Sequence, residues 1–135
     1  DEIRVILNSV GGDVFDGLLV FDTIRSIVNR GVPVIIEVRG LAASMAPIIL
    51  QAGSKRVASK YTRFLLHEIM TMTIGRTSEQ EEQVIELRKL NSMLRDILVE
   101  RTGKPAEAID KAWKKTERWL SAEEALEFGL IDEVV

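Results

Sequence analysis

The sequence predicts an α/β fold in which neighbouring strands pair in parallel. Segments with strand composition alternate with segments of helical periodicity along the chain, which is typical of layered α/β proteins. The second strand-like segment, 32–38, is largely apolar, as expected for a strand buried on both faces of a parallel sheet. No internal repeat or linker interrupts the 135 residues, so one domain spanning 1–135 is expected.

The first half of the chain supplies the alternation. Segment 3–7 is β-rich and runs into Asn8-Ser9-Val10-Gly11-Gly12, a turn signal. Apolar residues at helical spacing predict a helix over 16–29, which Gly31 ends. The strand over 32–38 follows, and Gly40 is expected to open a turn into a helix of small residues at 42–52.

The second half is expected to be mainly helical. Short strands are predicted at 57–58 and 64–67, and 69–74 is β-prone. A long amphipathic helix is predicted over 78–101, with Ser78 and Glu81 as a capping box. The break at 103–105 precedes a short helix at 106–114. Ser121 caps a further helix at 122–128, Gly129 ends it, and 130–135 closes as a strand.

The composition excludes several kinds of chemistry. The chain has no cysteine, which rules out disulfides, thiolate metal sites and a cysteine nucleophile. Its single histidine, His67, cannot form a multi-histidine site, so no metal and no cofactor are expected. A net charge of −3 gives no reason to propose nucleic acid as a partner. The sequence contains no run of about 18 apolar residues, so it predicts no membrane span.

The start of the chain bears on its origin. Asp1 and Glu2 carry the wrong charge for the basic region of a signal peptide, so a cytoplasmic location is expected. Because the first residues read at once as a strand, the chain is expected to begin inside a larger domain.

The first candidate site is the segment Gly40-Leu41-Ala42-Ala43-Ser44-Met45-Ala46. A serine stands between a buried strand and a helix, among small residues that let a substrate backbone come close. Free N–H groups at a helix N-terminus can stabilise an oxyanion. Taken alone, this pattern is more often a helix cap or a small packing residue.

Two further features could take part in chemistry. Gly11 and Gly12 follow a strand and permit close approach of backbone to a ligand, although a tight turn explains them equally well. His67 ends an apolar run, where a lone histidine is more often structural. Neutral imidazole is nevertheless the usual acceptor of a serine proton near pH 7.

In their order and spacing, these segments resemble the Clp protease proteolytic subunit family over essentially the whole chain. The matching segments are NSVGGDVFDGLLVFDTI, GLAASMAP, LLHE and WLSAEEALEFGLIDEV. The resemblance implies an α/β fold of the ββα spiral kind, shared with crotonase-like enzymes, with a long handle helix. It also implies that the family's N-terminal region is absent from this chain.

The resemblance also implies roles for individual residues. Ser44 would be the nucleophile, and His67 would take its proton and return it to the leaving amine. The N–H groups of Gly12 and Met45 would form the oxyanion hole. Substrate would be bound by Gly11 and by the β-prone segment 69–74, where an extended peptide would add as a strand along Ile69 and Met70.

Four departures from the family pattern are present. Val10 replaces a usual proline, Ala46 replaces a usual glycine, and Glu68-Ile69-Met70 stands where a glycine pair is expected. Glu117 stands where the family carries its triad aspartate. A glutamate can fill this role. In having a glutamate here, the chain resembles the Clp-like peptidases of phages and prophages. The alternatives are a surface charge at Glu117, with Asp110 as the fallback acid.

The function expected from this resemblance is an ATP-dependent-type serine endopeptidase subunit that cleaves unfolded polypeptides inside a homo-oligomeric chamber. The implied assembly is a pair of heptameric rings stacked as a tetradecamer. The implied partner is an AAA+ unfoldase. Two alternatives belong to other classes: a catalytically silent scaffold subunit, and a crotonase-like acyl-CoA enzyme. A serine–lysine dyad using Lys55 or Lys60 is a variant that the match at His67 makes unnecessary.

Overall fold

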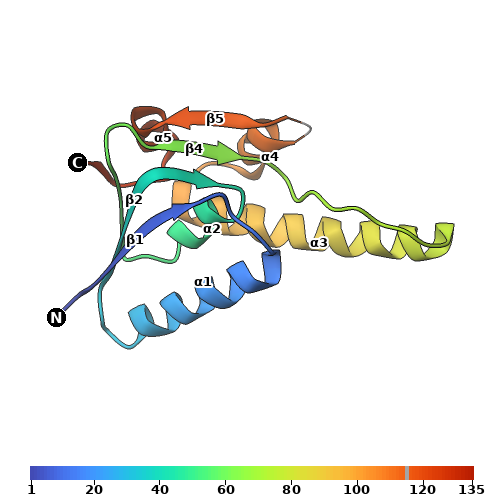
Figure 1. Cartoon of the computed structure of the whole chain (residues 1–135), viewed down its shortest axis with the longest axis horizontal. Helices are drawn as coiled ribbons and strands as arrows, with labels where there is room; N and C mark the ends of the chain where they lie inside the picture. The colour runs from blue at the N-terminus through green and yellow to red at the C-terminus, as the bar shows by residue number, and fades with distance from the viewer. Residues whose placement is uncertain (115) are drawn as a thin grey trace.

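The computed structural model describes residues 1–114 and 116–135, and it confirms the predicted α/β class. Within these residues six strands form one sheet, with helices packed around it (Figure 1). The elements in chain order are β1 (Ile3–Ser9), α1 (Val14–Asn29), β2 (Val34–Ala43), α2 (Ala46–Leu50), β3 (Lys55–Ala58), β4 (Arg63–Leu66), α3 (Thr77–Thr102), α4 (Ala106–Trp113), β5 (Arg118–Ser121), α5 (Ala122–Phe128) and β6 (Glu133–Val134).

Strand β2 organises the sheet. It pairs in parallel with β1, with β3 through its first half and with β4 through its last residues. Strand β6 extends the sheet in parallel beyond β3, whereas β5 pairs antiparallel with β4. Because β3 and β4 each use a different stretch of β2, the sheet divides along this strand. The expected parallel pairing is confirmed, and the β4–β5 pair is an antiparallel addition.

The strand β2 and its end differ from the prediction. Strand pairing continues to Ala43, where Leu41, Ala42 and Ala43 lie opposite residues of β4. The turn expected at Gly40 is therefore absent, although its φ of 86° bends the strand there. The helix expected at 42–52 shrinks to α2, because hydrogen bonding to β4 takes the small residues into the sheet. The β-prone segment 69–74 has no strand partner among the described residues.

The long helix α3 is confirmed, but its cap and its apolar stripe are not as expected. It starts at Thr77, and the Arg76 N–H donates to Glu79 Oε2 at 3.0 Å, so the capping box of Ser78 and Glu81 is wrong. Only the C-terminal half contributes to the core, through the buried Leu94 and Leu98. The N-terminal half extends away from the body (Figure 1), which leaves its apolar residues Val84 and Ile85 exposed.

A buried arginine ties the C-terminal residues to the sheet. Arg56 on β3 is only 6% exposed and donates to both carboxylate oxygens of Asp132. It also donates to Gln51 Oε1 at 2.7 Å and to the carbonyl oxygen of Gly129 at 2.8 Å. Burial raises the pKa of Asp132, but the hydrogen bonds from Arg56 and the charges of Arg56 and Arg101 outweigh it and lower the pKa overall.

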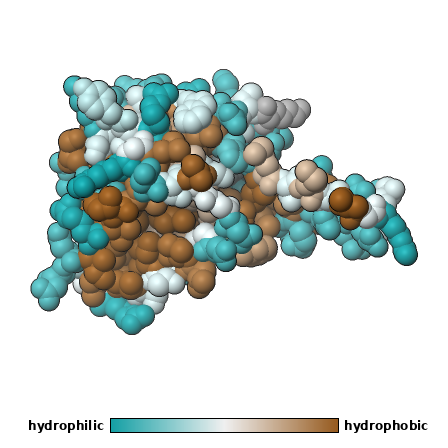
Figure 2. Space-filling model, in the orientation of Figure 1, coloured by the Kyte–Doolittle hydropathy of each residue, from teal (hydrophilic) through white to brown (hydrophobic). Residues whose placement is uncertain are grey.

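An exposed apolar face lies over β1 and α1, where hydrophobic side chains gather in one area of the surface (Figure 2). A patch of this kind on a small protein commonly marks an interaction site. Among the described helices, none combines the length and the hydropathy needed for a membrane span. The exposed apolar residues of the face are Ile3, Ile6, Val10, Phe15, Leu19 and Val20.

Candidate active site

Ser44 sits in a strained turn between β2 and α2. It is the one residue other than glycine with positive φ in the described chain, at 61°. This left-handed conformation costs an L-residue roughly 1–2 kcal/mol, and such strain clusters at functional sites. The Ser44 N–H donates to the carbonyl oxygen of Leu65 at 3.1 Å, which fixes the turn to β4. A serine on a sharp strand-to-helix turn is the arrangement that exposes the nucleophile in many hydrolases.

The loop after β1 lies directly on this turn. Gly11 has φ of 91°, and a Cβ built on it would stand 2.7 Å from both the Ala43 oxygen and Ser44 Cβ. The same Cβ would stand 2.9 Å from the Met45 nitrogen. Only glycine therefore fits at position 11, whereas a Cβ on Gly12 would meet nothing within 4 Å.

Gly12 and Met45, whose N–H groups are the expected oxyanion donors, line the same pocket as Ser44. Among the hydrogen bonds that the described residues form, none uses the N–H of Gly12 or of Met45. The Met45 side chain is 3% exposed and packs on Gly17 of α1, where a Cβ would come within 2.2 Å of Met45 Cγ. The contact of Gly17 with Met45 is not predicted from the sequence. The only pattern that indicates it is a glycine within the apolar face of a helix.

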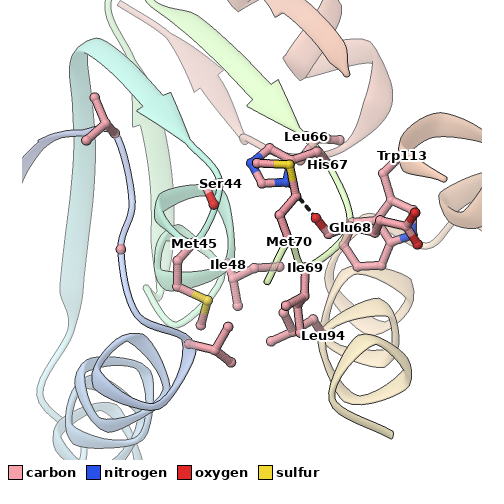
Figure 3. A pocket seen from close by; sticks show the side chains of 13 residues that line it. Ser44, Met45, Ile48, Leu66, His67, Glu68, Ile69, Met70, Leu94 and Trp113 are labelled. Atoms are coloured by element: carbon pink, nitrogen blue, oxygen red, sulfur yellow. Dashed lines mark hydrogen bonds between the residues drawn. The ribbon is translucent and has the colours of Figure 1, made fainter. Parts of the chain in front are cut away.

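His67 follows the last residue of β4, so the expected strand 64–67 ends just before it. Its Nδ1 lies 2.6 Å from the carbonyl oxygen of Glu68. A carbonyl oxygen can only accept, so Nδ1 carries a proton in this hydrogen bond, and in a neutral imidazole Nε2 then holds the lone pair. In Figure 3 the second ring nitrogen is on the side of the imidazole that faces Ser44.

Ser44 and His67 line one pocket of about 280 Å³, on facing walls (Figure 3). In the described chain no hydrogen bond joins the two side chains. Catalytic contacts are often long in the absence of substrate. The pocket is also lined by Gly12, Met45, Ile69 and Met70, which were singled out from the sequence, whereas Gly11 lines a neighbouring pocket. Lining residues that the sequence reasoning did not find are Val10, Val14, Ile48, Leu66, Glu68, Leu94 and Trp113.

Glu117 lies near the end of the β4–β5 ladder. Leu66 pairs with Arg118, so Glu117 continues the register at the position opposite His67. Its side chain is exposed and forms no hydrogen bond or ion pair with any described residue. It does not line the pocket of Ser44 and His67.

The other candidate partners lie elsewhere. Asp110 pairs with Arg95 at 3.4 Å and lines a neighbouring cavity. Lys55 is bound to Glu133, at 2.5 Å, on the far part of β3. Lys60 stands over the ring of Tyr61. None of the three lines the pocket that contains Ser44.

Helices α3 and α4 hold the backbone just after His67. The Ile69 N–H donates to Asn91 Oδ1 on α3 at 2.9 Å, and the Glu68 N–H donates to the Trp113 carbonyl oxygen on α4 at 3.4 Å. Trp113 is 4% exposed, so this support belongs to the core. Asn91 was not singled out from the sequence, because a polar residue on a helix gives no local sign of what it binds.

A strained serine that shares a pocket with a histidine on an α/β fold is an arrangement typical of the class of serine hydrolases. The family comparison is more specific. The model of the Clp protease family matches residues 1–135, and the chain belongs to this family.

Curated relatives support the assignment. The chain is 37% identical to the ATP-dependent Clp protease proteolytic subunit of Bacteroides fragilis, over 99% of this chain and 64% of that relative. It is 37% identical to proteolytic subunit 1 of Protochlamydia amoebophila, over 98% of this chain and 65% of the relative. It is 35% identical to the proteolytic subunit of Porphyromonas gingivalis, over 99% of this chain and 60% of that relative. The chain thus spans less than two thirds of each of these relatives.

Proposed function

We propose that the chain is a serine endopeptidase subunit that cleaves polypeptides with Ser44 and His67. One observation carries this proposal: a strained serine and the sole imidazole of the chain line the same pocket, next to two unengaged N–H groups. The membership of the Clp protease family supports the same reaction. The rest of the mechanism follows from the positions of these groups.

In the proposed reaction Ser44 Oγ attacks the scissile carbonyl carbon while His67 Nε2 accepts the hydroxyl proton. The N–H groups of Gly12 and Met45 would receive the oxyanion that develops. The imidazolium then protonates the leaving amine, and a water molecule hydrolyses the acyl-enzyme by the same route in reverse. Each oxyanion donor is worth on the order of a hundredfold in rate.

The substrate would bind along the segment 69–74. Its side chains Met70, Met72 and Ile74 are exposed, and the segment has no strand partner among the described residues. An extended peptide can supply this partner by strand addition. Because Asn91 already holds the Ile69 N–H, backbone pairing would begin at Met70. Gly11 would contribute by letting the peptide backbone close over the nucleophile turn.

Glu117 is the proposed third member of the catalytic set. Its support is the β4–β5 register, whose last pair, Leu66 with Arg118, precedes His67 and follows Glu117, and the family resemblance. The carboxylate could bind Nδ1 only if Nδ1 releases the carbonyl oxygen of Glu68. Glu117→Gln therefore measures how much the carboxylate adds.

The assembly proposed is a homo-oligomeric chamber of heptameric rings, stacked in pairs and served by an AAA+ unfoldase. The exposed apolar face over β1 and α1 supports contacts between copies of the chain. The relatives' names describe subunits of an ATP-dependent protease. Native mass spectrometry tests the assembly. Leu19→Glu puts a charge on the exposed apolar face of α1 and should lower the mass of the assembly. Asp22→Ala on the same helix should leave that mass unchanged.

The activity is tested by labelling with a fluorophosphonate probe and by hydrolysis of a fluorogenic peptide. Ser44 should be labelled, and Ser44→Ala should remove both labelling and hydrolysis. A folded wild-type chain, at its native mass, that neither reacts with the probe nor cleaves the peptide would overturn the proposal. That result would instead favour the silent scaffold subunit.

A further inference from the structure

One peptide unit links the imidazole to helix α3. The carbonyl oxygen of Glu68 accepts from His67 Nδ1 at 2.6 Å. The N–H on the other side of that same peptide bond, which belongs to Ile69, donates to Asn91 Oδ1 at 2.9 Å. The peptide plane is therefore bound at both ends, by the imidazole and by the amide of Asn91.

We propose that Asn91 is a positioning residue for catalysis, acting through this peptide on the orientation and tautomer of His67. The inference rests on the proposed function of Ser44 and His67. A peptide whose N–H is bound becomes a better acceptor at its carbonyl oxygen, since linked hydrogen bonds polarise one another. The carbonyl oxygen keeps the proton on Nδ1, so Nε2 presents its lone pair toward Ser44.

The chain of hydrogen bonds from Asn91 through the Glu68–Ile69 peptide to His67 is called the relay here. Three features separate it from the carboxylate of a triad. It is made by a backbone carbonyl that takes no proton, so it fixes the tautomer without titrating. Its ends belong to packed elements, since Asn91 stands on α3 and Trp113 of α4 holds the preceding N–H of Glu68. The exposed Glu117 forms no bond with His67 in the described chain.

The relay also assigns a use to the segment that departs from the family pattern. Where a glycine pair is expected, Ile69 is packed against the core and its N–H is directed to Asn91. The pocket wall formed by this segment is thereby held in place by α3, and the strand-adding part of the segment starts one residue later. The departure at Glu68 and Ile69 and the presence of Asn91 form one arrangement.

The tautomer of His67 gives a direct test, because the chain contains no other histidine. In a chain labelled with ¹⁵N at histidine only, a long-range proton–nitrogen spectrum should show a proton on Nδ1 in the wild type at neutral pH. Asn91→Leu removes the acceptor and should shift the ring toward a mixture of tautomers. Asn91→Asp keeps an oxygen acceptor at the same place and should restore the wild-type signals.

Peptide hydrolysis gives the second readout. Asn91→Leu should lower kcat on the order of tenfold, with KM changed less than twofold, as expected for a lost orienting hydrogen bond. Asn91→Asp should recover most of this loss. Ser92→Ala is the matched control, since Ser92 lines the neighbouring cavity on the same helix and should leave both readouts unchanged. If Asn91→Leu does not fold, Asn91→Ala removes the amide without adding bulk.

Two results would overturn the inference. One is an Asn91→Leu chain that keeps both the wild-type tautomer and the wild-type kcat. The other is a change of tautomer in Glu117→Gln that does not occur in Asn91→Leu, which would give the orienting role to the carboxylate. Because the nitrogen spectrum needs no turnover, a wild-type chain without hydrolysis would refute the proposed function while the relay is still measured.

Discussion

Replacement of Gly11 by alanine tests the contact between the loop after β1 and the nucleophile turn. Gly11 and Gly31 have nearly the same positive φ, 91° and 89°. An added Cβ at Gly11 meets the backbone oxygen of Ala43 at 2.7 Å, whereas at Gly31 nothing lies within 4 Å. Gly31→Ala is therefore a control that carries the conformational cost alone.

The two costs can be worked out separately. A left-handed L-residue costs roughly 1–2 kcal/mol, so Gly31→Ala should lower the free energy of unfolding by about that amount. Gly11→Ala should lower it by about 1–3 kcal/mol more, because rigid backbone atoms must move apart. If Gly12 is an oxyanion donor as proposed, the same movement should displace it from Ser44, and the loss of one such donor should lower kcat on the order of a hundredfold.

Urea unfolding followed by circular dichroism measures the first quantity, and hydrolysis of a fluorogenic peptide measures the second. Gly31→Ala should retain the wild-type kcat. The reasoning is refuted if Gly11→Ala matches Gly31→Ala in both stability and kcat, because the loop would then not rest on the turn as described.

Three further changes have defined outcomes. Ser44→Gly should be more stable than Ser44→Ala by about 0.5–1 kcal/mol, since relief of the positive φ exceeds the entropy cost of glycine; equal stability in urea would show that the turn is unstrained. Gly17→Ala should lower the free energy of unfolding by about 1 kcal/mol, because crowding of Met45 outweighs the gain in helix propensity. Its kcat should also fall, and an unchanged kcat would argue against a role of Met45 in the oxyanion hole. Because the pKa of Asp132 is lowered by folding, its stabilising effect is present above the ordinary aspartate value of 3.8 and is lost as pH falls through the folded value. Asp132→Asn should cost about 2 kcal/mol at pH 7, and the difference from wild type should shrink on acidification below pH 3.8; a difference independent of pH in urea titrations would contradict this.

The class of the fold could be predicted because periodicity is a local property. The apolar run of β2 and the helical spacing in α1 are set by neighbouring residues, and both were confirmed. The extension of β2 through Gly40 to Ala43 was not foreseen, because it depends on hydrogen bonding to β4, which lies later in the chain. Local propensity at Ala42 and Ala43 favours a helix, and sheet pairing overrode it.

The candidate site divides in the same way. Ser44 and His67 were found because their types and surrounding segments form motifs, and the structure places them in one pocket. Their catalytic roles stay predictions, as does that of Glu117. The contacts of Asn91 and Gly17 could not be predicted, because each depends on which side chain or peptide the tertiary fold brings beside it.

The N–H of Ser44 is bonded to Leu65, two residues before His67. Ser44 follows the last residue of β2 and His67 follows the last residue of β4, so the pairing of these two strands fixes where both residues start. The connection between the two strands is itself part of the core, since α2 is buried and β3 pairs with β2. Any shift of register between these two strands would therefore move the Ser44 hydroxyl relative to the His67 imidazole.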